Sequence, residues 1–253
     1  MEDIKFIIFD LDGVFYKDDH CIKGGKEIIK HLKENDIEFC FLTNNSNHSV
    51  EFYKNRLTTC KIFIEEERVV TTGVLLQNYI VKNFPTKSSI YVLGSNFLKN
   101  SLYGLFDLND TNPDIIVLGM DENIKLKDIS KVINIISDKT KIIASNPDKL
   151  IPKKETFGLE CGVLIDIIKD VTGKDIKVVG KPDSFAYSYI IEKFSADKKQ
   201  ILMVGDTYET DIIGAKNFGL KTVWVNTGNK LPTSIRDGNF LRIDSLKELV
   251  KFL

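Results

Sequence analysis

Two carboxylates stand directly after the first apolar run of the sequence. Residues 6–9 are apolar, and they are followed by Asp10, Leu11, Asp12 and Gly13. Side chains alternate along a strand, so Asp10 and Asp12 would share one face, and Gly13 would let the chain turn away. Two carboxylates this close repel each other unless a divalent cation binds to them or one of them is protonated. The pair therefore predicts a chemical site, and the plain alternative is an acidic turn after a strand.

Polar residues also stand at the ends of three later apolar runs. The runs span about residues 37–42, 176–179 and 200–204, and the polar residues beyond them are Thr43 with Asn44, Lys181, and Asp206 with Asp211. Each alone has an ordinary structural explanation, because short polar residues cap helices and charged residues favour helix ends or solvated loops. Four such strand ends in one chain are hard to explain by coincidence, so we expect them to belong to one site.

The spacing of apolar residues predicts the elements that would hold these side chains. A helical pattern spans about residues 25–34, between the strands 6–9 and 37–42. A strand, a helix and a second parallel strand form a right-handed crossover, which brings the carboxyl ends of both strands to one edge of a sheet. Ligands of open parallel sheets bind at that edge. Thr43 is therefore expected to face the same pocket as the acidic pair.

A second alternating series of helices and strands begins near residue 70. Its predicted elements span residues 72–83, 89–93, 114–118, 125–137, 141–144 and 162–172. The order of elements restarts there without a linker. We therefore expect an α/β protein with a Rossmann-like parallel-sheet core formed by residues 1–69 and 179–253, and a second α/β domain, residues 70–178, inserted into it.

The composition is that of an ordinary globular protein. Lys and Arg number 35 and Asp and Glu 36, so we expect no binding to nucleic acid polymers or membranes. The chain shows neither a signal peptide nor an apolar run near the roughly 18 residues that a membrane span needs, which favours a cytoplasmic protein. The four cysteines lack Cys-x-x-Cys spacing, and we expect most of them to be small buried hydrophobic residues.

The polar strand ends, taken together and in this order, resemble the motifs of the haloacid dehalogenase superfamily, specifically its phosphatase branch. The resemblance covers essentially the whole chain. The insert between Thr43 and Lys181 resembles the C2-type α/β cap of the p-nitrophenyl phosphatase, phosphoglycolate phosphatase and NagD-like members. Residues 144–148, Ala-Ser-Asn-Pro-Asp, and residues 205–212, Gly-Asp-Thr-Tyr-Glu-Thr-Asp-Ile, resemble that subfamily in particular.

The resemblance implies a role for each of the predicted site residues. Asp10 would be the nucleophile that forms an aspartyl-phosphate, and Asp12 the general acid and base. Phosphate would be bound by Thr43, Asn44 and Lys181; Mg²⁺ would be bound by Asp10, the main-chain carbonyl of Asp12 and Asp206; Asp211 would orient Lys181 or a metal-bound water. An acid at position 12 argues for hydrolysis rather than dehalogenation.

The substrate is implied only as a class, small-molecule phosphate monoesters. By their position in the cap, Asn146, Asp148 and Cys161 are candidates for contact with the leaving group. From the same resemblance we expect that a homodimer, if one forms, uses the cap.

Two hypotheses of another kind stay open at this point. Phospho-receiver signalling domains also combine a strand-end acid, Mg²⁺ and a Lys-Pro dipeptide, but they are about half this length and place the acceptor Asp alone on a middle strand. A non-catalytic protein that binds Mg²⁺ and phosphate is the second. A dinucleotide oxidoreductase is disfavoured, because no Gly-x-Gly-x-x-Gly follows the first strand.

Overall fold

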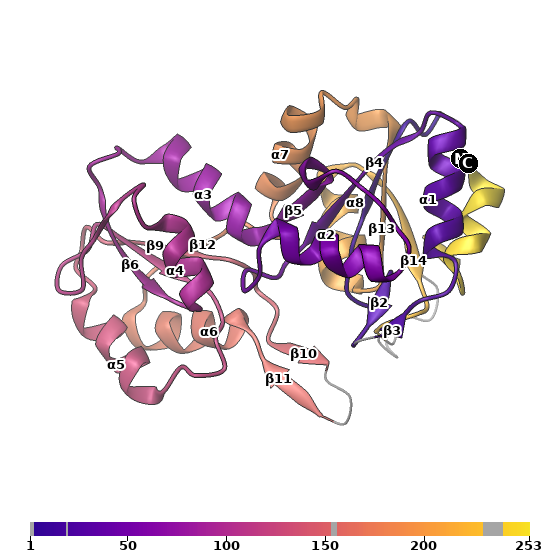
Figure 1. Cartoon of the computed structure of the whole chain (residues 1–253). Helices are drawn as coiled ribbons and strands as arrows, with labels where there is room; N and C mark the ends of the chain where they lie inside the picture. Colours follow the sequence, from indigo (N-terminus) through magenta and orange to yellow (C-terminus); the bar gives the residue numbers. More distant parts are fainter. Residues whose placement is uncertain (1–2, 19, 153–155, 230–239) are drawn as a thin grey trace. The chain divides into compact units, whose positions relative to one another are not determined.

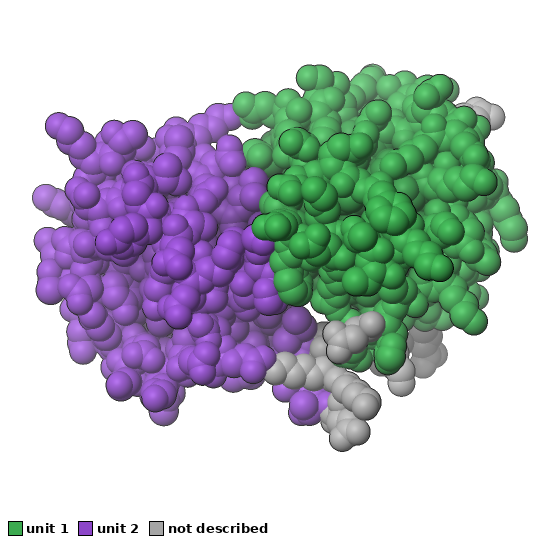
Figure 2. Space-filling model, in the orientation of Figure 1, with its two compact units in different colours: residues 1–43, 50–70, 181–253 green, residues 44–49, 71–180 purple. Residues whose placement is uncertain are grey.

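The computed structural model describes residues 3–18, 20–152, 156–229 and 240–253, and the chain forms two compact units (Figures 1 and 2). We call residues 1–43, 50–70 and 181–253 the core unit, and residues 44–49 and 71–180 the insert unit. The α/β class with parallel sheets that the sequence predicted is confirmed. Among the described residues, no helix is both long and apolar enough to cross a membrane.

The core unit is built on a six-stranded sheet with the strand order β15-β14-β13-β1-β4-β5. From one edge to the other, these strands are Leu241–Ile243, Lys221–Val225, Ile201–Gly205, Phe6–Phe9, Glu38–Thr43 and Val69–Thr71. Strand β1 pairs in parallel with β13 on one side and with β4 on the other. Strand β1, which precedes the first acidic motif, therefore lies between β13 and β4, two strands whose ends carry other motifs.

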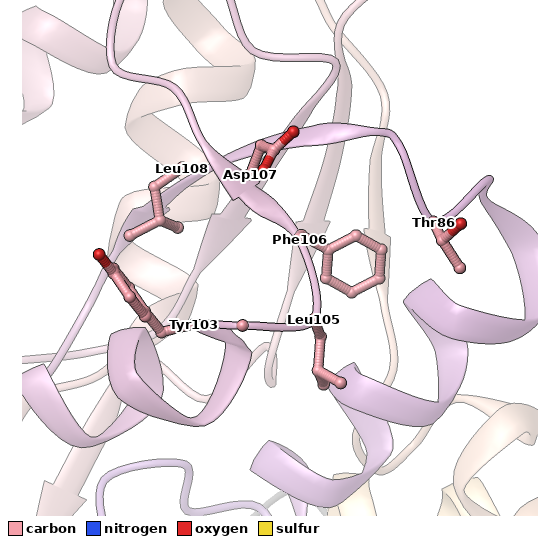
Figure 3. A pocket seen from close by; sticks show the side chains of 7 residues that line it. Thr86, Tyr103, Leu105, Phe106, Asp107 and Leu108 are labelled. Carbon is pink, nitrogen blue, oxygen red and sulfur yellow. The ribbon is translucent and has the colours of Figure 1, made fainter.

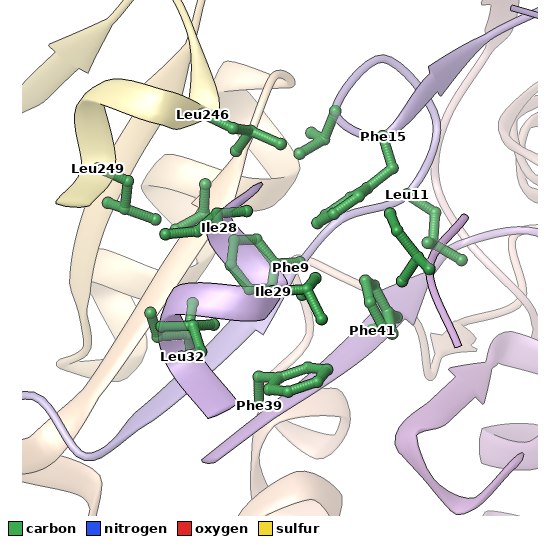
Figure 4. Close-up of a cluster of buried hydrophobic side chains, with 14 of the residues drawn as sticks. Phe9, Leu11, Phe15, Ile28, Ile29, Leu32, Phe39, Phe41, Leu246 and Leu249 are labelled. Atoms are coloured by element: carbon green, nitrogen blue, oxygen red, sulfur yellow. The ribbon is translucent and has the colours of Figure 1, made fainter. Parts of the chain in front are cut away.

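All four residues of β1 are buried, as expected for a strand with both faces covered. On one face, aromatic rings pack edge to face, with centroids 5.2 Å apart for Phe9 and Phe15 and 5.1 Å apart for Phe15 and Phe41 (Figure 4). Helix α1, Gly25–Glu34, adds Ile28, Ile29 and Leu32 to this cluster, and the C-terminal 3₁₀ helix η4, Leu246–Phe252, adds Leu246 and Leu249. The strand that carries the first motif is thus held in a close-packed core, which fixes its end.

The helical elements of the core unit include the helix that the sequence predicted over about residues 25–34. They are α1 Gly25–Glu34, α2 Val50–Thr59, η1 Glu66–Arg68, α7 Ser184–Phe194, η2 Lys198–Gln200, the π-helical turn η3 Tyr208–Ile213, α8 Gly214–Phe218 and η4 Leu246–Phe252. A short antiparallel hairpin, β2 Tyr16–Lys17 and β3 His20–Cys21, follows the first motif.

The insert unit has its own sheet, with the order β12-β9-β8-β6-β7. In that order, these strands are Ile176–Val178, Lys141–Ala144, Ile115–Leu118, Ser89–Leu93 and Asp107–Leu108. The helices of the unit are α3 Thr72–Asn83, α4 Asn96–Leu102, α5 Leu126–Ile135 and α6 Cys161–Thr172. A separate hairpin consists of β10 Leu150–Pro152 and β11 Phe157–Leu159. The loop after α4 borders a pocket of about 430 Å³ that includes Tyr103, Leu105 and Leu108 (Figure 3). None of the predicted site residues lines this pocket.

Cys21 and Cys60 form a disulfide, so the expectation of a buried hydrophobic cysteine was wrong for these two. It holds for Cys40 and Cys161, which are free and buried. The disulfide joins strand β3 of the hairpin to the residue that follows helix α2, and both lie in the core unit. The sequence could not reveal the pair, because 39 positions separate the two cysteines.

Replacing both Cys21 and Cys60 by Ser is expected to destabilise the core unit. A cross-link over 39 positions removes loop-closure entropy from the unfolded chain, so its loss should lower the free energy of unfolding by about 2–4 kcal/mol. Urea unfolding of the oxidised protein and of the double variant measures this difference. In the presence of a reductant the two proteins should unfold alike, and a difference that persists there would trace the effect to the serines instead.

Candidate active site

The ends of β4, β1 and β13 meet at one edge of the core sheet. In the register of the sheet, Phe9 is paired with Val204 on one side and with Phe41 on the other. Asp10 directly follows β1, Thr43 is the last residue of β4, and Asp206 directly follows β13. The structure therefore brings together at one edge three of the strand ends that the sequence singled out.

Lys181 marks the fourth strand end that the sequence singled out, and its side chain is buried between two carboxylates of the core unit. It begins a cis Lys181–Pro182 peptide just before α7, whose N-terminus is capped by Asp183. Its Nζ donates to Asp10 Oδ1 at 2.6 Å and to Asp211 Oδ1 at 2.7 Å. Burial alone would lower the pKa of Lys181, but the two carboxylates raise it above its usual value, so the ammonium stays charged.

Asp211 is fully buried, and both of its carboxylate oxygens are engaged within the core unit. Oδ1 accepts from Lys181, and Oδ2 accepts from the main-chain N–H of Thr207 at 3.0 Å. The helical turn η3 begins at Tyr208 after Thr207, and Asp211 lies in its first turn. Asp211 contacts Lys181 and does not only complement a helix dipole. Its contacts suit a side chain that orients Lys181.

Asp10, Asp206 and Asp211 together form a buried acidic cluster. One carboxylate oxygen from each lies within 4.8 Å of the others, and no other such group of three exists among the described residues. Burial and, to a smaller extent, the charge of Asp211 raise the pKa of Asp206 to about 7; burial also raises the pKa of Asp10 well above its usual value, against the effect of Lys181. Crowded, dehydrated carboxylate oxygens of this kind fit a hard divalent cation such as Mg²⁺.

Residues near the carboxyl end of β14 complete the surroundings of Asp206, and the sequence patterns did not single them out. The main-chain N–H of Asn229 donates to Asp206 Oδ2 at 2.7 Å, and Trp224 Nε1 donates to the main-chain carbonyl of Asp206 at 2.8 Å. A Cβ atom at Gly13 or Gly228 would overlap the Asp206 carboxylate, so both positions need glycine. Residues 226–229 form another polar strand end, and the rule that found the other motifs would have found it as well.

Asp12 differs from Asp10 in exposure and in partners. The Asp12 side chain is 46% exposed, against 11% for Asp10. Partial burial raises the pKa of Asp12, and the nearby guanidinium of Arg56 opposes that rise. An accessible carboxyl group with a raised pKa is suited to exchange protons with a substrate and with water, whereas Asp10 is held in place by Lys181.

In the insert unit, Asn146 and Asp148 both contact Asn44. Asn44 Nδ2 donates to Asp148 Oδ2 at 2.8 Å, and Asn146 Nδ2 donates to the main-chain carbonyl of Asn44 at 2.8 Å. Cys161 is buried, and its thiol donates to the carbonyl of Leu118 at 3.4 Å. These contacts give Asn146, Asp148 and Cys161 a structural role, and contact with substrate stays a prediction for each of them.

Two models of known protein families match parts of this chain. Residues 7–105 match the model described as haloacid dehalogenase-like hydrolase, and residues 178–249 match a second model of HAD-like hydrolases. An acid sugar phosphatase of Staphylococcus aureus is 31% identical over 251 residues, which cover 98% of this chain and 96% of the relative. An acid sugar phosphatase of Staphylococcus epidermidis is 30% identical over the same shares.

Solved structures of similar fold have related names. The 4-nitrophenylphosphatase of Thermotoga maritima superimposes with a TM-score of 0.90 at 30% identity, covering 98% of this chain and 97% of the other. NagD of Escherichia coli superimposes with a TM-score of 0.86 at 25% identity, covering 97% and 98%. The likeness extends over nearly the full length of each chain.

Proposed function

The chain belongs to the haloacid dehalogenase-like hydrolases and is a phosphatase, and we propose that it hydrolyses small phosphate monoesters with Mg²⁺ through an aspartyl-phosphate. One observation carries the proposal: Lys181 holds one oxygen of Asp10 inside the buried acidic cluster, at the edge of the sheet where β1 ends. Asp10 Oδ2 makes no hydrogen bond to the described residues, which leaves it available as a nucleophile.

The proposed reaction uses the two acids of the first motif in turn. Asp10 attacks phosphorus, a P–O bond forms to its carboxylate, and the P–O bond to the substrate alcohol breaks as Asp12 protonates the leaving oxygen. Asp12 then accepts a proton from the water that attacks the aspartyl-phosphate, which releases inorganic phosphate and restores Asp10. Lys181, Thr43 and the main-chain N–H of Asn44 would bind the phosphoryl oxygens.

The acidic cluster would hold the metal ion. Asp10 and Asp206 would supply carboxylate oxygens and Asp12 its main-chain carbonyl, while Asp211 stays bonded to Lys181 and Thr207 and acts through them. A bound Mg²⁺ would neutralise negative charge on the phosphoryl group and on the carboxylates. Lys181 supplies one further positive charge beside Asp10, and it orients the carboxylate for attack.

The substrates are proposed to be small phosphate monoesters of the aryl, sugar, glycolate or nucleotide type. The names of the relatives favour sugar and aryl phosphates within this class. We further propose that the insert unit is the cap of the enzyme, that Asn146, Asp148 and Cys161 influence substrate choice, and that any homodimer forms through this unit. Action in the cytoplasm, and the lack of nucleic acid and membrane partners, stay predictions from the sequence.

The test of the proposed function is hydrolysis of a panel of phosphate monoesters, assayed with Mg²⁺ and with a chelator. The panel should include p-nitrophenyl phosphate, phosphoglycolate, sugar phosphates, pyridoxal phosphate and nucleotides. Mg²⁺-dependent release of phosphate, fastest for one chemical class, is the expected result. Release that is unaffected by chelation would contradict the metal role, and no release from a folded, Mg²⁺-binding protein would contradict phosphatase activity on these substrates.

Mg²⁺ affinity is expected to rise as the pH rises toward 7. In the metal-free protein, burial raises the pKa of Asp206 to about 7, so this carboxyl is largely protonated at pH 6 and must lose its proton to bind the ion. Because the folded state holds that proton and the unfolded state does not, the metal-free protein should lose stability as the pH rises from about 4 to about 7.

Calorimetric titration at pH 6, in two buffers of different ionisation enthalpy, measures the protons released when Mg²⁺ binds. Proton release at pH 6 that declines toward pH 8 is expected. The Asp206→Asn variant, which has no proton to lose at this position, is the control and should release fewer protons if it binds the ion. Equal affinity and no proton release at both pH values would contradict the assignment.

A further inference from the structure

Arg56 lies beside Asp12, and neither the motifs nor the similarity to known proteins gives it a function. It belongs to helix α2, Val50–Thr59, in the core unit. Its Nη1 lies 3.9 Å from Asp12 Oδ1, and 44 positions of the chain separate the two residues. The side chain is 24% exposed, so it is partly withdrawn from solvent rather than extended into it.

Two further contacts fix the guanidinium of Arg56 in place. It stacks over the ring of Tyr16, with Cζ 3.8 Å from the ring centroid, and Nη2 donates to the main-chain carbonyl of Asp18. Tyr16 is 1% exposed, and its hydroxyl has no hydrogen-bond partner among the described residues, so its ring serves as a packing surface. A guanidinium that is stacked and hydrogen-bonded loses little further freedom when it pairs with a carboxylate.

Main-chain contacts also connect Tyr16, on which Arg56 stacks, with the first motif. Asp12 forms an isolated bridge with Tyr16, and Gly13 N–H donates to the carbonyl of Tyr16 at 2.7 Å. The disulfide joins the hairpin that begins at Tyr16 to the end of the helix that carries Arg56. The Arg56 cation, its aromatic support and the Asp12 carboxyl are therefore parts of one local assembly.

From these contacts we propose that Arg56 is a positioning residue for Asp12, holding its carboxyl group where it can protonate the leaving oxygen. Asp12 is half exposed, and Arg56 is its ion-pair partner within the described residues. An exposed carboxyl without a fixed partner samples several rotamers, and a fixed cation at 3.9 Å favours those that face it. The proposal rests on the proposed function, because it assigns Asp12 the proton transfer described above.

The proposal predicts a loss that depends on the leaving group. An alkoxide must be protonated as it leaves, whereas p-nitrophenolate leaves with little help, so misplacement of a general acid harms alkyl phosphates more. The parameter to compare is kcat/KM, because it reports the steps up to departure of the alcohol. For Arg56→Gln we expect a loss of about 10- to 100-fold on an alkyl or sugar phosphate and less than about 3-fold on p-nitrophenyl phosphate.

A double-mutant cycle then tests whether Arg56 acts through Asp12. In an Asp12→Asn background, Arg56→Gln should cause no further loss on the alkyl substrate. Lys54→Gln is the matched control, since Lys54 lies on the same helix and pairs instead with Glu66 at 3.1 Å. Tyr16→Phe keeps the aromatic surface and should retain wild-type rates, and Arg56→Lys keeps the charge without the planar stack and should recover part of the activity.

The outcomes separate this proposal from the proposed function. If the wild-type protein hydrolyses neither substrate, the proposed function fails first. If the wild type is active and Arg56→Gln loses the same factor on both substrates, or loses activity equally in the Asp12→Asn background, then Arg56 has only a structural role and the proposal is overturned. Should Arg56→Gln fail to fold, Arg56→Lys and Tyr16→Leu, which weaken the same contact, must show the same dependence on leaving group.

Discussion

The Asp10→Asn variant is expected to lose essentially all turnover while keeping its fold. An amide is a far weaker nucleophile than a carboxylate, so kcat should fall by about 10³-fold or more, as it does when other enzymes lose their nucleophile. Asn is nearly the same size, and its amide oxygen can still accept the hydrogen bond that Lys181 Nζ now donates to Asp10 Oδ1 at 2.6 Å. Steady-state hydrolysis of p-nitrophenyl phosphate with Mg²⁺ measures the effect.

Two controls accompany this experiment. The thermal unfolding temperature of the variant should stay close to that of the wild type, which shows that a loss of rate is not a loss of fold. The Asp3→Asn variant, a substitution of the same kind at an exposed position of the core unit, should keep full activity. Activity of Asp10→Asn near the wild-type level would exclude Asp10 as the nucleophile.

The Lys181→Met variant is expected to show the largest loss of stability. Lys181 is 2% exposed, and its ammonium is the ion-pair partner of Asp211, which is fully buried. Removing one member of a buried ion pair leaves the other charge uncompensated, which costs about 3–5 kcal/mol. Urea unfolding should therefore show a lower free energy of unfolding, and activity should be lost as well, because Asp10 loses the same cation.

The Lys181→Met/Asp211→Asn double variant tests the cause of that loss. Removing the charge of Asp211 as well should restore part of the stability, because the carboxylate that lost its partner is then neutral. A loss below about 1 kcal/mol in the single variant, or no recovery in the double variant, would show that the ion pair contributes little to the fold.

The regular elements of this fold could be predicted because their sequence patterns are local. Strands at Ser89–Leu93 and Lys141–Ala144 and the helix Thr72–Asn83 have the predicted bounds. Each is a short apolar run between turn residues or a helical pattern between polar residues, so its neighbours in sequence suffice to define it. The meeting of strand ends at one edge of the core sheet also follows, because parallel strands joined by crossovers end on the same side.

Other parts of the site could not be predicted, because they depend on contacts between distant residues. The sequence does not show that Lys181 lies between Asp10 and Asp211, nor that Arg56 stacks on Tyr16. Helix α2 looks like an ordinary surface helix, and only the fold places one of its residues beside the first motif. Asp211 is a similar case: an acidic residue near the start of a helix has a local explanation, but the buried ion pair of Asp211 with Lys181 leaves no local pattern.

Identification of the phosphorylated residue tests the central claim most directly. The protein should be mixed with p-nitrophenyl phosphate and Mg²⁺ and quenched in acid during turnover, and the phosphoryl group should then be located by mass spectrometry of its peptides. An Asp12→Asn variant, which hydrolyses the intermediate slowly, should accumulate more of it. We predict an acid-stable adduct on Asp10 that disappears when substrate is exhausted. Continued turnover with the phosphoryl group on another residue, or with none on the protein, would contradict the aspartyl-phosphate mechanism.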